Sequence, residues 1–159
     1  MIMSIRNLQI WNRGDRIPEI YGTLITLALI LYFFAMYAIG LVHVIELRLL
    51  NIFIMLGGIY LAMKQYKRTH EGHLNYFRAL TIGVATAAIG ASTFAVFLLI
   101  YLKIDQQLMQ SIISHEPMGR YLNEYIAAAA VTIEGTFSGF TMTYVLLNFV
   151  ETDKVTEPT

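Results

Sequence analysis

The sequence predicts an all-α membrane protein: an antiparallel bundle of four transmembrane helices, with a short outer interfacial helix between the third and fourth spans. Composition is the first observation behind this fold. Of the 159 residues, 57% are hydrophobic and only 14% are charged, whereas soluble domains are nearer about 45–50% apolar and about 25% charged. The second observation is that the apolar excess lies in four long runs. Each run approaches the roughly 20 residues that cross a bilayer.

The four apolar runs fill most of the chain and leave no room for a second domain, so we expect a single membrane domain over residues 1–159. The first run follows Pro18, which suits a first helical turn because its missing N–H is not needed there. The second run is the shortest, and flanking residues must complete it. The spans are expected at about residues 20–44, 47–63, 77–101 and 123–150.

Basic residues are distributed unequally between the two sides of this bundle. Cytoplasmic segments of membrane proteins carry the excess of lysine and arginine. We therefore expect both termini in the cytoplasm. The richer side holds Arg6, Arg13, Arg16, Lys64, Lys67, Arg68 and Arg78, and the poorer side holds Arg48, Lys103 and Arg120.

The link between the third and fourth spans has the pattern of a short amphipathic helix. Asp105 is placed to cap its N-terminus, and Pro117 is placed to stop it. Such a helix would lie in the outer membrane interface. The alternative is a partly ordered loop packed on the bundle. The apolar positions at helical spacing are Leu108, Met109, Ile112 and Ile113.

Glu134 lies within the fourth predicted span. About ten residues separate it from the outer end of that span, which is about 15 Å of helix and close to the middle of a hydrocarbon layer of about 30 Å. A carboxylate at that depth is expected to face the bundle interior or water, or to be protonated. Matching depths along the spans predicts a buried polar site made of Glu134, Ser138, Thr141, Tyr37, Ser92 and Thr93.

Three roles are open for this acid. It could relay protons or cations, it could dock a polar group of a partner subunit, or it could hold the helices in register. A relay usually needs several aligned ionisable groups. Because the middle of the spans shows only Glu134, docking or a structural role is favoured.

Small residues at four-residue spacing predict closely packed helices. Gly135 and Gly139 form a G-x-x-x-G pattern, which lets membrane helices approach until dispersion forces and interhelical hydrogen bonds hold them. The pattern fits contacts within this chain or with a partner. The other glycines expected at helix contacts are Gly57, Gly58, Gly83 and Gly90.

Signatures of catalysis and of metal binding are missing from the sequence. It has no phosphate-binding glycine loop, nucleophile elbow or cysteine. His70 and His73 lack the i,i+4 spacing of a zinc-protease helix. A net charge of zero gives no basic field for nucleic acid. We therefore expect no catalytic residue, no metal and no cofactor apart from bound lipid.

The basic loop after the second span is a candidate lipid headgroup site. Lys64, Lys67 and Arg68 would each contribute about 1 kcal/mol near an anionic membrane surface. The alternative is that these charges only set the orientation of the chain in the membrane.

The segment from the second span to the end of the third resembles a bacterial family of small four-helix membrane proteins, called domain of unknown function 4199. Four features carry the resemblance. The second span ends in G-I-x-x-x-x-x-x-Y and is followed by a basic loop. The third span starts with aromatic-x-A-L-x-x-G and has an aromatic end with I-D. It implies a polytopic inner-membrane protein and transfers no catalytic residue. The matching positions are Gly58, Ile59, Tyr66, Phe77, Ala79, Leu80, Gly83, Tyr101, Ile104 and Asp105.

These features favour a non-enzymatic accessory or scaffolding subunit of a larger membrane complex in the bacterial cytoplasmic (inner) membrane. Its partners would be membrane lipids together with other membrane subunits or further copies of the chain. Two alternatives remain: a proton or ion transport component centred on Glu134, and a lipid-binding or regulatory protein that uses the basic loop.

Overall fold

The computed structural model describes residues 16–40, 45–70, 73–115 and 117–150, with the backbone alone for 45–49. Over these ranges the protein is all-α, with five α-helices and one short 3-10 turn. The elements in chain order are α1 (Ile17–Ala38), α2 (Ile45–Thr69), α3 (Tyr76–Ile104), α4 (Gln106–His115), η4 (Gly119–Tyr121) and α5 (Glu124–Leu147).

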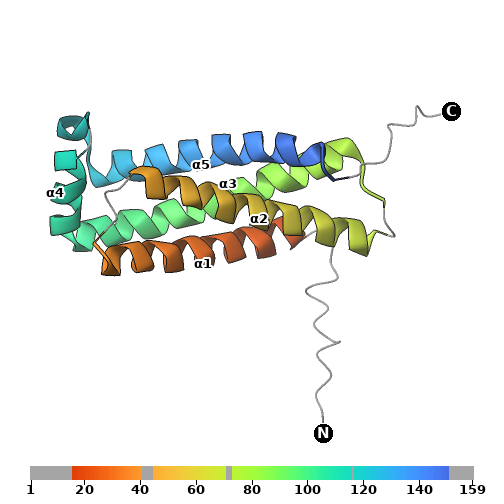
Figure 1. Cartoon of the computed structure of the whole chain (residues 1–159), viewed down its shortest axis with the longest axis horizontal. Helices are drawn as coiled ribbons and strands as arrows, with labels where there is room; N and C mark the ends of the chain where they lie inside the picture. Colours follow the sequence, from red (N-terminus) through yellow and green to blue (C-terminus); the bar gives the residue numbers. More distant parts are fainter. Residues whose placement is uncertain (1–15, 41–44, 71–72, 116, 151–159) are drawn as a thin grey trace, which may run out of the picture.

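The four long helices lie side by side with alternating directions, and α4 lies across one end of them (Figure 1). Helix α3 is central and packs against α1, α2 and α5, while α2 contacts the same two outer helices. Helices α1 and α5 therefore lie on opposite sides of α2 and α3 (Figure 1). Each of these outer helices keeps a wide face that no other helix covers.

The long helices occur where the apolar runs predicted them, with shifted ends. Helix α1 ends at Ala38, before the predicted limit, and Gly40 follows it with a positive φ of 71°. Residues 41–44 of the predicted first span lie outside the described residues. Helix α2 extends beyond its predicted end to Thr69, because lysine, glutamine and arginine are good helix formers although they are polar. By length and composition, α1 and α3 could each cross a membrane.

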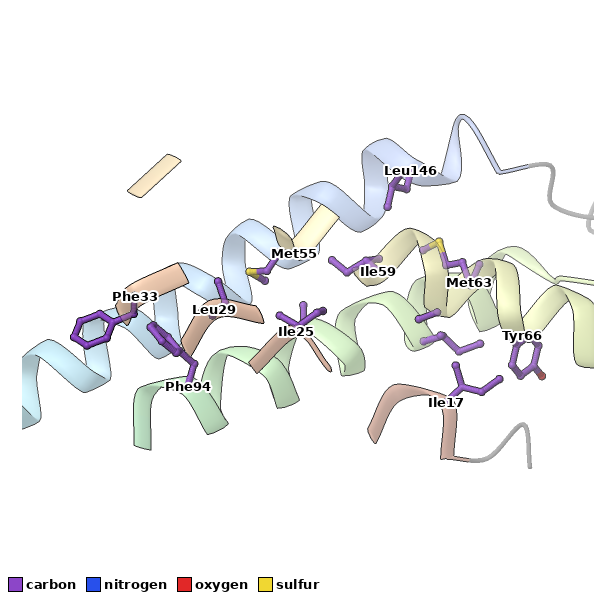
Figure 2. Close-up of a cluster of buried hydrophobic side chains, with 14 of the residues drawn as sticks. Ile17, Ile25, Leu29, Phe33, Met55, Ile59, Met63, Tyr66, Phe94 and Leu146 are labelled. Atoms are coloured by element: carbon purple, nitrogen blue, oxygen red, sulfur yellow. The ribbon is translucent and has the colours of Figure 1, made fainter. Parts of the chain in front are cut away.

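Large apolar side chains fill the space between the four helices. Ile25 of α1, Ile59 and Met63 of α2 and Leu102 of α3 are at most 2% exposed. Figure 2 shows part of this cluster, in which side chains from α1, α2, α3 and α5 meet along the length of the bundle. The core runs as a strip between the helices and leaves their outer faces free.

The linker between α3 and α5 forms a helix, so the predicted helix is confirmed and the loop alternative is wrong. The Oδ1 atom of Asp105 accepts the N–H of Leu108 at 3.0 Å, which caps the first turn of α4. Met109 is 2% exposed and belongs to the core. The apolar side of α4 therefore covers the end of the bundle, while Gln106, Gln110 and His115 are exposed.

Candidate functional site

The inward face of α5 is built from glycines that meet alanines of α3. A Cβ atom added to Gly135 would lie 2.7 Å from the Cβ of Ala91. One added to Gly139 would overlap the Cβ of Ala87 and lie 2.9 Å from Cε of Met55. The two backbones thus approach more closely than any larger residue would allow.

A threonine continues the same contact toward the other end of α5. Thr143 is fully buried, and its hydroxyl donates to the carbonyl of Gly139 at 2.7 Å. A Cβ atom at Gly83 would meet its Cγ2 at 2.5 Å. Gly83, Gly135 and Gly139 therefore all lie at the contact between α3 and α5.

Two more of the predicted glycines lie at contacts with α1. Gly90 of α3 faces Ile25, and its carbonyl accepts the Thr26 hydroxyl at 3.2 Å. Gly58 of α2 also faces Ile25, whose Cδ1 would be 2.6 Å from an added Cβ atom. Within this chain the prediction for Gly57 is wrong: nothing lies within 4 Å of its Cβ position. Neighbouring positions on a helix differ by about 100°, so only one of this adjacent pair faces α1.

The prediction that Glu134 is buried is also wrong. Its side chain is exposed on the outside of α5, between exposed Ile133 and half-buried Gly135. The glycine face turns α5 so that Gly135 and Gly139 point inward. Glu134, rotated by about 100° from Gly135, then lies beyond the edge of the contact. The carboxylate reaches the outer surface near the middle of α5 (Glu124–Leu147).

The remaining members of the predicted polar site do not gather around Glu134. Ser92 and Thr93 are exposed on α3, and Thr141 is exposed on α5, where its hydroxyl donates to the carbonyl of Phe137 at 3.0 Å. Ser138 is half-buried. A single buried polar site made of these residues is therefore absent from the part of the chain that the structure describes.

The exposed face of α5 instead carries apolar side chains in a regular row, and five of the six are large. Six exposed positions follow one another at alternating steps of four and three residues, the spacing of a helix that packs along a straight seam. Ile133 and Phe137 at its centre are 70% and 71% exposed. Glu134 and Thr141 flank the row, seven residues apart. We call the row the α5 seam; it consists of Ile126, Ala130, Ile133, Phe137, Phe140 and Tyr144.

Tyr37 lies at the α4 end of the bundle, away from the middle of the helices. Its hydroxyl donates to Oδ2 of Asp105 at 2.8 Å and ties the last turn of α1 to the junction of α3 and α4. The Leu108 N–H first, and the Tyr37 hydroxyl second, hold the pKa of Asp105 below its ordinary value. The sequence predicted the cap by Asp105 but showed no signal for the bond to Tyr37.

An aromatic cluster continues this connection between α1 and α3. The ring of Phe33 packs edge to face against Phe97 at 5.8 Å and against Tyr101 at 5.1 Å between centroids. Tyr37 packs against Tyr101 in the same way at 5.8 Å. Because these rings contact one another directly, the cluster joins the two helices as a packed unit.

A protein-family model described as "Protein of unknown function (DUF4199)" matches residues 20–150. The match covers all four long helices except the first turn of α1. The chain belongs to the DUF4199 family. This confirms the resemblance, which rested on the middle of the sequence. Among curated proteins and among solved structures, nothing matches the chain.

The three predicted headgroup residues of this DUF4199 chain lie at the end of the bundle opposite α4. Lys64 and Arg68 are exposed on the last turns of α2, and Lys67 is half-buried. The Nζ atom of Lys64 lies 5.9 Å from the ring centroid of Tyr60, within cation–π range. Two of the three predicted headgroup residues are thus freely accessible to an anionic group.

Metal-binding chemistry has no candidate among the described residues of this family member. No group of three or more histidine, aspartate or glutamate side chains is close enough there to hold an ion. His70 is stacked on Tyr66 at 3.9 Å between ring centroids. The carboxylate of Glu134, exposed on the outside of α5, belongs to no such group among the described residues.

Proposed function

We propose that the chain is a non-enzymatic accessory subunit of a larger membrane complex. In this proposal all four long helices cross the bilayer as an antiparallel four-helix bundle. Both termini lie in the cytoplasm, and the protein resides in the bacterial inner membrane. The support comes from the outer surface of the bundle, from its charges and from one carboxylate.

The outer surface is apolar on every long helix. The apolar stretch of α1 is only 28% buried inside the protein, so most of it needs an apolar environment other than its own core. Soluble monomers rarely expose so much apolar surface, and hydrocarbon would cover it. Strongly exposed examples are Leu27 and Leu31 of α1, Phe53 and Leu61 of α2, Phe77 and Val96 of α3, and Ile133 and Phe137 of α5.

The distribution of charge supports the orientation. The end of the bundle at the start of α3 carries Lys64, Lys67, Arg68 and Arg78, whereas the α4 end carries Lys103 and Arg120. An excess of lysine and arginine favours the cytoplasmic side. The polar outer surface of α4 would then face the opposite aqueous phase.

The single observation that carries the accessory role is the exposed carboxylate of Glu134 among exposed apolar residues. No hydrogen bond or ion pair joins it to another described residue. Insertion scales assign about 2.5–3.5 kcal/mol to an ionised side chain at the centre of a membrane helix. Contact with a polar group of a second protein removes much of that penalty, and contact with lipid does not.

The transport alternative has less support from this geometry. Glu134 lies on the outside of α5 and so does not line a path between the helices of one chain. A transport path at Glu134 would require several chains around it.

Purification from native membranes in a mild detergent tests the proposed function. We expect the full-length chain to elute as a complex with at least one other membrane polypeptide, identified by mass spectrometry. A monodisperse complex of the chain with lipid and detergent alone would overturn the proposal.

Binding of anionic lipid is a second candidate, favoured by the exposed side chains of Lys64 and Arg68. Native mass spectrometry would then detect phosphatidylglycerol retained by the wild-type chain and lost from the Lys64→Gln, Arg68→Gln variant. Equal retention by both proteins would exclude this candidate.

A further inference from the structure

The α5 seam has the geometry of a helix-packing surface that is still unoccupied within one chain. Its steps of four and three residues match the a and d positions of a heptad pattern. In that assignment Ala130 and Phe137 are a positions, and Ile133 and Phe140 are d positions. Glu134 and Thr141 are then both e positions, which border the seam. Residues at e and g positions select a partner by charge and hydrogen bonding.

The charge of Glu134 indicates what that partner presents. Its carboxylate accepts hydrogen bonds and carries no proton donor when ionised. In the middle of a membrane the matching group is a lysine or an arginine, which neutralises the charge and supplies N–H donors. A partner helix with only apolar residues at this height leaves the carboxylate unpaired.

A second copy of the same chain does not provide this group. Copies in one membrane share an orientation, so two α5 helices would pack in parallel. In a parallel pair each e position lies next to the g position five residues earlier in the other helix. Glu134 would then face Ala129 of the second copy, and Thr141 would face Thr136. Helix α5 contains no lysine, arginine or histidine at all.

We propose that the α5 seam binds a single transmembrane helix of a different protein, and that this helix carries a lysine or arginine opposite Glu134. This inference rests on the proposed function and gives it a location and a partner chemistry. The seam supplies the packed contact, and the pair formed by Glu134 with the basic side chain determines which helix is accepted.

Reconstitution with synthetic helices tests the pairing directly. The full-length chain, labelled with a donor dye, is placed in phosphatidylcholine vesicles with an acceptor-labelled leucine–alanine helix that carries one central lysine. A matched helix has glutamine in place of the lysine. Energy transfer should show the lysine helix binding about tenfold more tightly than the glutamine helix, the size expected for one strong polar contact in a membrane.

Variants of the chain identify the residue responsible. Glu134→Gln should remove the preference for the lysine helix, and Glu134→Lys should transfer it to a helix with a central glutamate. Glu124→Gln, at the start of the same helix, is the matched control and should keep the wild-type preference. Thermal unfolding of each variant verifies that the fold is unchanged.

Several outcomes would overturn the inference. One is equal affinity for the lysine and glutamine helices, and another is a preference that survives in Glu134→Gln. A third is energy transfer between two labelled copies of the chain that Glu134→Gln abolishes, because the occupant would then be a second copy.

The proposed function and this inference fail in different ways. If native membranes yield a complex that persists in Glu134→Lys, the accessory role stands and the pairing at Glu134 is wrong. If no other polypeptide accompanies the wild-type chain, the accessory role itself is wrong.

Discussion

The inward and outward faces of α5 differ in side-chain size over the middle of the helix. Gly135 and Gly139 face α3, and the carbonyl of Gly139 accepts a bond from buried Thr143. On the opposite face Ile133 and Phe137 are 70% and 71% exposed. In a soluble protein the large apolar residues would be expected inside.

A lipid environment, as in the proposed function, would account for this reversal. In water, burial of large apolar side chains drives helices together, whereas lipid solvates such side chains as well as a protein core does. Close approach of backbones and hydrogen bonds then hold membrane helices together, and small residues permit both. The inward face of α5 is thus suited to fold stability, and the outward face is free to bind another helix.

The strongest test of this contrast places a large residue on the inward face. Gly139→Leu should lower the free energy of unfolding by about 3 kcal/mol, because even a Cβ atom there would overlap Ala87. Unfolding in mixed detergent micelles measures the change. The control is Ala130→Leu on the exposed side of α5. A similar loss in both variants would contradict the division of α5 into two faces.

An adjacent pair of glycines tests the same contrast on α2. Gly58→Ala should cost about 1–3 kcal/mol, because the new methyl group meets Ile25, which is 2% exposed. Gly57→Ala meets nothing within 4 Å and should leave stability unchanged or raise it by up to about 1 kcal/mol. The thermal midpoint of Gly58→Ala should therefore be lower than that of the wild type, and that of Gly57→Ala should be equal to it or higher. Equal losses would place both glycines at a contact.

The hydrogen bonds of Asp105 at the α4 end of the bundle should contribute less to the free energy of unfolding than the glycine contacts do. Their contribution should depend on pH. The Leu108 N–H and the Tyr37 hydroxyl lower the pKa of Asp105 from its ordinary value of 3.8. The stabilisation is complete above 3.8 and is lost as the pH falls through the lower folded-state pKa. The thermal midpoint of the wild type should fall on acidification to about pH 3. The thermal midpoint of Asp105→Asn should be lower than that of the wild type at neutral pH, and it should fall less on acidification.

Tyr37→Phe separates the two hydrogen bonds of Asp105. It removes the bond to Oδ2 and keeps the Leu108 N–H, so it should show part of the acid sensitivity of the wild type. If the thermal midpoint of Tyr37→Phe depends on pH in the same way as that of the wild type, the hydrogen bond to α1 adds nothing to the acid sensitivity.

The smallest effect on folding is expected on the outward face. Phe137→Ala should change the free energy of unfolding by no more than about 0.5 kcal/mol, because the ring is 71% exposed. The same variant should weaken binding of the lysine helix. Phe94→Ala, which removes a ring that is 7% exposed, is the control and should cost about 3–5 kcal/mol.

Much of the fold was predictable because apolar runs and capping residues are local signals. Asn123 begins α5 by accepting the N–H of Ile126 at 2.8 Å, and Asp105 begins α4 in the same manner. Both lie at the predicted boundaries. Such signals depend on a few neighbouring residues, and the sequence shows them directly.

The position of Glu134 was not predictable from depth alone. Glu134 does lie near the middle of its helix, as predicted, but Tyr37 does not lie at the matching height, and the direction of a side chain around the helix decides its burial. In a soluble helix the apolar stripe marks the inward face, whereas α5 is apolar on nearly all sides. The usable signal was the glycine pair: if Gly135 and Gly139 face inward, Glu134 cannot share their contact.

The bond between Tyr37 and Asp105 shows a second limit of sequence reasoning. These residues are 68 positions apart and meet only because α1 and α3 run in the same direction and finish at the same end of the bundle, where α4 turns across them. The length of the linkers and the crossing of the helices set such a pairing. No local pattern carries that information.

The central helix α3 is synthesised before α5, and this order has a consequence for the assembly of the protein. Ala87 and Ala91 are synthesised before α5, so this surface of α3 remains uncovered until α5 follows. Helix α5 brings both the glycines that complete the fold and the seam that would receive a partner. In the proposed function, recruitment would therefore begin only after α5 has been synthesised, and a truncated product ending before Glu124 would lack the means to bind a partner.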